Sequence, residues 1–158
     1  MRPSIIQLKQ LVFQRVLVEA AKPLDQVTPG EAAEFEFDKV RFRINLDIGT
    51  GDDESDLNQR EYVVLLGIGI DNSEGKPAPY KIDVLAAGLI EVSEKVEEEK
   101  RADLATVNGA SLVYGAIREM VCSVTSRCVA GTFLLPTMDF RDHVTKQPAK
   151  AAKETKPV

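Results

Sequence analysis

The segment 108–140 constrains the fold most strongly, because its pattern predicts one long helix followed by an apolar loop. Apolar side chains recur there at steps of three and four residues, which aligns them along one face of a helix. These side chains are Val113, Ile117, Met120 and Val124. Asn108 suits the N-cap, because its side-chain oxygen can accept a hydrogen bond from the first helical turn. We expect the helix to end around Ala130 and Gly131, since glycine favours helix C-termini.

A second face of the predicted helix carries mostly small side chains. It comprises Ser111, Gly115, Cys122 and Ser126, with Glu119 between them. Small side chains let another backbone approach closely. We therefore expect this helix to pack against neighbours on both faces.

The loop that follows the helix is rich in large apolar side chains. Residues 133–140 contain five of them, which are Phe133, Leu134, Leu135, Met138 and Phe140. Pro136 prevents a regular helix through this stretch. Such a loop either closes the core or lines a groove.

Four segments before the helix have the pattern of β-strands. They are residues 5–20, 34–48, 62–70 and 80–92. The second alternates most regularly, because every other residue from Val40 to Ile48 is apolar and the residues between them are polar. We expect a β-bulge near Leu11–Phe13, where the alternation changes parity, and a second irregularity near Asp38–Lys39.

These elements predict an α+β fold: a four-stranded antiparallel β-meander followed by a long helix and a short C-terminal helix or loop. The chain of 158 residues is expected to form one domain, residues 1–144. Residues 145–158 hold lysines and prolines but almost nothing to bury, which predicts a disordered tail.

Composition narrows the class of protein. A net charge of -5 without a dense basic patch argues against a nucleic-acid partner. The first residues lack a signal-peptide core, and no apolar run approaches the ~18 residues needed to insert into a membrane, so we expect a cytoplasmic protein. Cys122 and Cys128 would lie about 9 Å apart along the helix at ~1.5 Å per residue. That separation exceeds the ~7 Å Cα limit for a disulfide, so we expect free thiols.

The sequence offers little for catalysis. His143 is its single histidine, so a histidine-based metal cluster, triad or dyad cannot be assembled. There is no nucleophile elbow, phosphate-binding glycine loop or paired-cysteine motif. The acidic loop at residues 52–56 resembles the start of a calcium loop but lacks its glycine and closing glutamate. We therefore expect no enzyme, no cofactor and no metal, and we note more apolar surface than one sheet face and one helix face require.

Three segments near the C-terminus carry a family resemblance. They read LVYGAIRE at 112–119, VTSR at 124–127 and LPTMDF at 135–140. In this order and spacing the chain resembles the SecB family of protein-export chaperones, whose long helix reads approximately ILFPYARECITSMVSR and whose apolar loop ends in APVNF. The end of the first predicted strand, at 18–20, and residues 83–90 of the fourth are also similar in character to this family.

The resemblance implies an ATP-independent holdase that keeps polypeptides unfolded, such as preproteins for Sec-dependent export, and assembles as a dimer of dimers through long helices and edge strands. The client-binding side chains it implies are Phe42, Leu46, Tyr62, Tyr114, Phe133, Leu134, Leu135, Met138 and Phe140, each of which has a plain core position as its alternative. The implied oligomer interface comprises Ser111, Gly115, Arg118, Glu119, Cys122 and Ser126.

The resemblance also implies that acidic residues on the sheet contact the SecA motor, and Glu19 and Asp83 match such positions. However, Arg15 stands where an acid is expected, and Lys81 stands where an apolar residue is expected. A SecB-like chaperone dedicated to an antitoxin of a toxin–antitoxin system therefore remains an alternative. A structural or adaptor protein and a small-ligand-binding α+β domain are alternatives from other classes.

Overall fold

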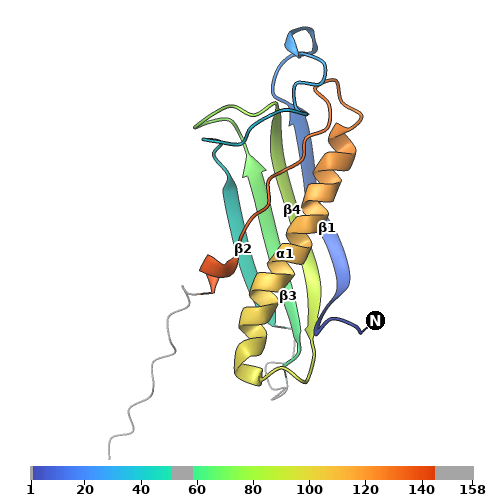
Figure 1. The fold of residues 1–158 in the computed structure, drawn as a ribbon, viewed down its shortest axis with the longest axis vertical. Helices are drawn as coiled ribbons and strands as arrows, with labels where there is room; N and C mark the ends of the chain where they lie inside the picture. Colours follow the sequence, from blue (N-terminus) through green and yellow to red (C-terminus); the bar gives the residue numbers. More distant parts are fainter. Residues whose placement is uncertain (1, 51–58, 145–158) are drawn as a thin grey trace, which may run out of the picture.

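The computed structural model describes residues 2–50 and 59–144, and its core is one antiparallel sheet covered on one face (Figure 1). The strands are β1 (Ile6–Ala20), β2 (Arg43–Thr50), β3 (Glu61–Ile70) and β4 (Tyr80–Val92). The helix α1 (Glu98–Thr125) and the extended segment 131–140 both cross the same face of the sheet. Two short 3-10 helices, η1 (Leu24–Gln26) and η2 (Arg141–His143), complete the described chain. The predicted α+β fold is confirmed, whereas the predicted tail 145–158 and the acidic loop at 52–56 lie outside the described residues.

The strand order is β1-β4-β3-β2. Strands β2, β3 and β4 form a meander of consecutive antiparallel hairpins, while β1 lies beside β4 after the long connection of residues 21–42. Three hairpin-connected strands with the fourth returned beside the far one form a Greek key. The predicted four-stranded meander is therefore correct for β2, β3 and β4 but wrong for β1. The period-two pattern could not show this order, because it marks which face of a strand is buried and not which strand lies next to it.

Strand β1 departs from a regular ladder at two places. Its register against β4 shifts between Leu8 and Gln10 and again between Phe13 and Arg15. These shifts flank the predicted bulge at Leu11–Phe13, and both are needed to keep the apolar side chains of this long strand on the helix side of the sheet.

Strand β2 begins at Arg43, later than the predicted start at residue 34. The backbone turns at Lys39, which has a φ of 62°, so the expected irregularity near Asp38–Lys39 is present. Because of this turn, Phe35 and Phe37 leave the strand. Their rings pack on the Phe133 ring, with centroids 5.7 and 5.0 Å away.

Helix α1 begins at Glu98, ten residues before the predicted N-cap at Asn108. The charge-rich residues 91–101, which precede the predicted helix, are therefore partly helical. The negative charges of Glu98 and Glu99 in the first turn interact favourably with the positive end of the helix dipole. Arg101 is buried, and its Nε donates a hydrogen bond to the Val96 carbonyl oxygen at 2.8 Å. Asn108 lies inside the helix and donates to the Leu104 carbonyl. The apolar period missed this first part because its buried positions include polar residues.

The helix ends at Thr125, earlier than the predicted end at Ala130 and Gly131. The buried Thr125 hydroxyl donates to the Val121 carbonyl at 2.7 Å, and its oxygen accepts a hydrogen bond from the Phe133 backbone N–H at 2.9 Å. Gly131 has a φ of 85°, which reverses the chain after the helix. Thr125 therefore joins the last helical turn to the segment that returns across the sheet.

Close packing joins α1 to the sheet. Val113, Ile117 and Val121 are fully buried on the helix face toward the sheet. A Cβ at Gly88 would lie 2.6 Å from the Val113 side chain, and a Cβ at Gly109 would lie 2.9 Å from the side chains of β3 and β4. Glycine at these two positions allows the close approach, and each fully buried aliphatic side chain stabilises the fold by about 1.5–3 kcal/mol.

Candidate polypeptide-binding surfaces

The structure divides the nine predicted client-binding residues into two groups. Tyr62, Tyr114, Phe133, Leu135 and Phe140 are buried and form part of the core in this conformation. Phe42, Leu46 and Met138 are half-buried, and Leu134 is 57% exposed. The apolar loop therefore closes the core with alternate residues and presents Leu134 to the surface. Client binding by the accessible four residues remains a prediction.

Two side chains of α1 hold the loop in this position. The Tyr114 hydroxyl donates to the Pro136 carbonyl at 2.6 Å, and Arg118 Nε donates to the Leu135 carbonyl at 2.8 Å. The Tyr114 ring also contacts the Phe140 ring, with centroids 5.7 Å apart. Burial raises the pKa of Tyr114 to about 12. These contacts decide which side chains of segment 131–140 face the core.

An apolar row is left accessible on the sheet edge formed by β2. We call it the β2 strip, and it comprises Phe42, Ile44, Leu46 and Ile48. In register, Ile44, Leu46 and Ile48 lie opposite buried residues of β3, so their side chains point to the face that α1 covers. The helix packs on β1, β3 and β4, which leaves Ile44 37% exposed and the rest of the strip half-buried. The sequence pattern identified this row, but not its accessibility.

The predicted oligomer interface forms a small-residue face on the outward side of α1. Ser111, Gly115, Glu119 and Ser126 are exposed, and Arg118 and Cys122 are half-buried. Five of these six residues, all except Ser111, line one open hollow of about 500 Å³ together with Ser123, Thr132 and Leu134. A Cβ built at Gly115 has no atom within 4 Å, so another backbone can approach there.

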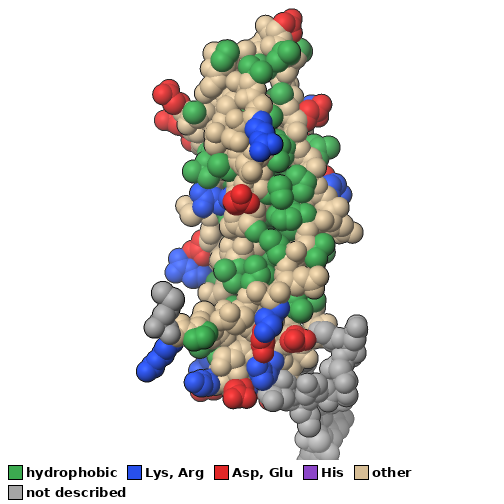
Figure 2. All heavy atoms as spheres, turned by 90° about the vertical axis from the view of Figure 1, so that its right-hand side faces the viewer, with side chains coloured by type: hydrophobic (Ala, Val, Ile, Leu, Met, Phe, Trp, Pro, Cys, Tyr) green, Lys and Arg blue, Asp and Glu red, His purple; other side chains and the backbone are tan. Residues whose placement is uncertain are grey.

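The sequence placed Met120 and Val124 on one face with the buried Val113 and Ile117, but the structure places them on a partly exposed apolar flank between α1 and β1. Leu112, Ala116, Met120 and Val124 follow one another at steps of four and line one side of the helix. The opposite side of α1 holds the segment 131–140, so this row faces β1. Leu8 and Val16 on β1 are 37% and 41% exposed, and Leu112 and Val124 are 42% and 37% exposed. Figure 2 shows apolar side chains gathered in a band along this side of the molecule.

The two residues predicted to contact SecA lie on the outer face of the sheet, away from α1. Glu19 is opposite Lys81 in the register, and Asp83 is opposite Leu17. Arg15 donates a hydrogen bond to the Asp83 carboxylate at 2.9 Å. The position where an acid was expected therefore carries a cation that pairs with one of the two acidic residues.

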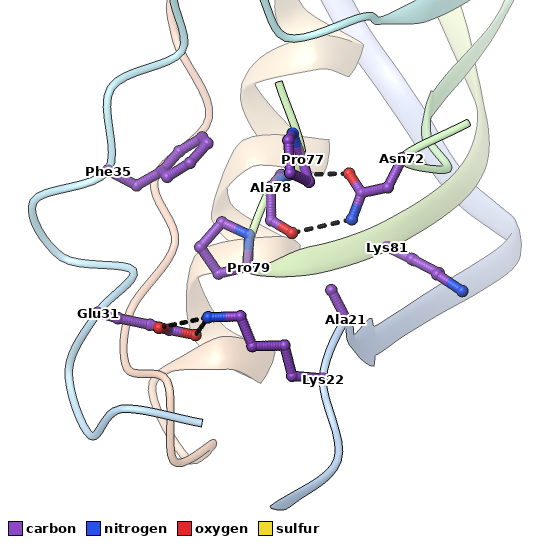
Figure 3. Close-up of a pocket in the computed structure, with 9 residues that line it drawn as sticks. All are labelled: Ala21, Lys22, Glu31, Phe35, Asn72, Pro77, Ala78, Pro79 and Lys81. Carbon is purple, nitrogen blue, oxygen red and sulfur yellow. Dashed lines mark hydrogen bonds and ion pairs between the residues drawn. The ribbon is translucent and has the colours of Figure 1, made fainter. Parts of the chain in front are cut away.

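A pocket of about 370 Å³ lies between the connection after β1 and the turn before β4 (Figure 3). Lys22 and Glu31 face each other across it in an ion pair of 3.0 Å. The Asn72 side chain donates to the Ala78 carbonyl and accepts from the Ala78 N–H, while Lys81 points away. The polar groups at this pocket are thus directed to protein atoms, which gives little support to a small-ligand site here.

Within the described ranges, no three of the histidine, cysteine, aspartate and glutamate side chains are placed to hold a metal ion. In the same ranges, no helix has the length and apolar character needed to cross a membrane.

The structure thus defines an α+β fold, in which one long helix covers a Greek-key sheet. Known proteins are similar to this chain in fold. No protein-family model matches the sequence, and no curated protein matches it either. A protein of unknown function from Streptococcus agalactiae is similar in structure, with a TM-score of 0.51, 11% identity, and coverage of 84% of this chain and 97% of that one. That likeness shows the fold.

A second solved structure also matches, at a TM-score of 0.49 and 17% identity. It is the Mycobacterium tuberculosis SecB-like chaperone in complex with a ChAD peptide from the HigA1 antitoxin. The match covers 85% of this chain and 91% of that one.

Proposed function

We propose that this chain is a non-catalytic, SecB-like chaperone that holds unfolded polypeptides on accessible apolar side chains. The observation that carries the proposal is the β2 strip, a continuous apolar row that the covering helix leaves accessible. Met138 is half-buried on the segment 131–140, which runs from the end of α1 toward β2 (Figure 1). The client is therefore expected to lie along β2.

The strength of such binding follows from the exposed area. A fully buried Leu, Ile or Phe contributes about 1.5–3 kcal/mol, and no side chain of the β2 strip is more than 37% exposed. One strip therefore binds a client weakly. Tight capture of a long chain requires several strips on one assembly, because the second contact is then intramolecular.

We propose that the assembly is a homo-oligomer, a dimer of dimers, that uses the small-residue face of α1 and the flank between α1 and β1. Strands β1 and β2 are the two opposite edges of the sheet. Contacts made through β1 and the outward face of α1 would therefore leave the β2 strip open to clients.

Two kinds of client are proposed, preproteins for Sec-dependent export and an antitoxin. The ion pair between Arg15 and Asp83 favours the second, because it neutralises an acidic group that contact with SecA would use. Titrating purified SecA into the chain and into Arg15→Ala tests this point. Tight binding of SecA by the unchanged chain would favour the export role.

The holdase proposal is tested by suppression of aggregation of a chemically denatured test protein. Ile44→Ser removes apolar surface from the β2 strip and should weaken suppression. Val63→Ser is the matched control, because Val63 lies on the outer face of the neighbouring strand and is 38% exposed, against 37% for Ile44. Equal effects of the two substitutions, or no suppression by the unchanged chain, would contradict the proposal.

A further inference from the structure

We infer that the free edge of β2 captures its client by strand addition, so that the polypeptide binds as a fifth strand of the sheet. This inference rests on the proposed function and specifies how its binding surface works. In the sheet of four described strands, β2 has β3 as its one neighbour. Among the described residues, no backbone hydrogen bond joins β2 to any other segment. Every second residue of an antiparallel edge strand directs its N–H and C=O groups away from the sheet.

The two edges of the sheet differ in how well they can receive a strand. Natural edge strands are protected from pairing by bulges, prolines or inward-pointing charges. Strand β1 has two register shifts, whereas β2 pairs with β3 without a shift over all of its 8 residues. Strand β2 also contains no proline, and its helix-side row holds no charge. By these three features the β2 edge is less protected than the β1 edge.

The side chains of β2 define the sequence that would fit. An added strand places alternate side chains beside Ile44, Leu46 and Ile48 on the helix side, where apolar residues are favoured. Its other side chains lie beside Arg43, Asn45 and Asp47 on the outer face. Because cross-strand neighbours of opposite charge are favourable, the client should carry an acid beside Arg43 and a base beside Asp47. In an antiparallel addition the base precedes the acid by four residues.

The occupant is thus an extended polypeptide with alternating apolar side chains and a base before an acid on its other row. A labelled probe peptide tests it: valine alternates with serine, one serine is replaced by lysine, and the serine four residues later by glutamate. Fluorescence anisotropy measures its affinity for the unchanged protein. A probe with the same composition but clustered valines is the control, and we expect it to bind at least about tenfold more weakly.

Backbone methylation separates strand addition from contact through side chains alone. Two further probes are methylated on alternate backbone nitrogens, one on the odd set and one on the even set. Strand addition predicts that one set loses at least about tenfold in affinity and the other loses little, because one set alone donates to β2. Equal affinity of the two methylated probes, whether both bind or both fail, overturns the inference.

The charge arrangement has its own test in Asp47→Lys, since Asp47 is exposed. This substitution should weaken binding of the probe about two- to fivefold. Replacing the probe lysine with glutamate should then restore the affinity for this variant. If adding the probe lowers the mass of the assembly, the probe has displaced a second copy of the chain from the β2 edge. That result would make the second copy the natural occupant of this edge and overturn the inference. If the unchanged protein suppresses aggregation but binds both methylated probes with equal affinity, strand addition is refuted and the proposed function stands. If the unchanged protein does not suppress aggregation, the proposed function itself is refuted.

Discussion

Adjacent residues Leu134 and Leu135 provide a test of how the apolar loop divides between core and surface. Leu135 is fully buried, whereas Leu134 is 57% exposed. Replacing a buried leucine with alanine removes transfer free energy and leaves a cavity, which typically costs about 2–5 kcal/mol. We therefore expect Leu135→Ala to lower the free energy of unfolding by that amount, a large part of the roughly 5–15 kcal/mol typical of a domain.

Leu134→Ala should behave differently, because more than half of this side chain already contacts water. The area that it buries corresponds to roughly 1 kcal/mol or less. The thermal midpoint should fall by about 4–20 °C for Leu135→Ala and by no more than about 4 °C for Leu134→Ala, at ~2–4 °C per kcal/mol for a chain of this size.

Urea unfolding followed by circular dichroism measures both variants. The slope of the free energy against urea should stay constant, since the area exposed on unfolding hardly changes. Equal destabilisation by the two substitutions would refute the division of the loop into buried and exposed residues. A slope that changes in Leu135→Ala alone would mean that the loop has detached from the core.

Three further predictions concern α1. Thr125→Val leaves the buried Phe133 N–H without its acceptor and should cost about 1–3 kcal/mol in urea unfolding, whereas Thr125→Ser should cost much less. The pKa of Tyr114 is raised to about 12 in the folded protein, so the folded state holds this proton more tightly than the unfolded state does. The free energy of unfolding should therefore fall as pH rises from about 10 to 12. In Tyr114→Phe, unfolding measured across this pH range should show a smaller fall. Gly115→Leu has open space around its Cβ and should weaken self-association in analytical ultracentrifugation without loss of folding, whereas Gly109→Leu meets side chains at 2.9 Å and should unfold the chain.

The secondary structure followed from the sequence where one face of an element is apolar throughout. The alternation from Ile44 to Ile48 identified β2. The small side chains around Gly115 predicted a second packing face of α1, and this face is exposed within the described chain. The start of α1 at Glu98 was missed, because buried Arg101 and Thr106 interrupt the apolar period with polar residues whose hydrogen bonds to backbone carbonyls form in the folded chain.

The candidate site was only partly accessible to sequence reasoning. The sequence pattern of the loop after α1 does not distinguish an apolar residue that faces the core from one that faces a client. Phe133 is buried because the rings of Phe35, Phe37 and Tyr80 surround it, and these come from distant parts of the chain. The free edge of β2 likewise depends on strand order, which no local pattern carries.

The sequence by itself thus determined an α+β chain with four strands, one long helix and more apolar side chains than those elements require. The tertiary structure decided which of those side chains stay accessible, by returning β1 beside β4 and leaving β2 as the second edge. The physical reason is that periodicity depends on neighbours a few residues apart, whereas burial depends on whichever distant segment lies against each face.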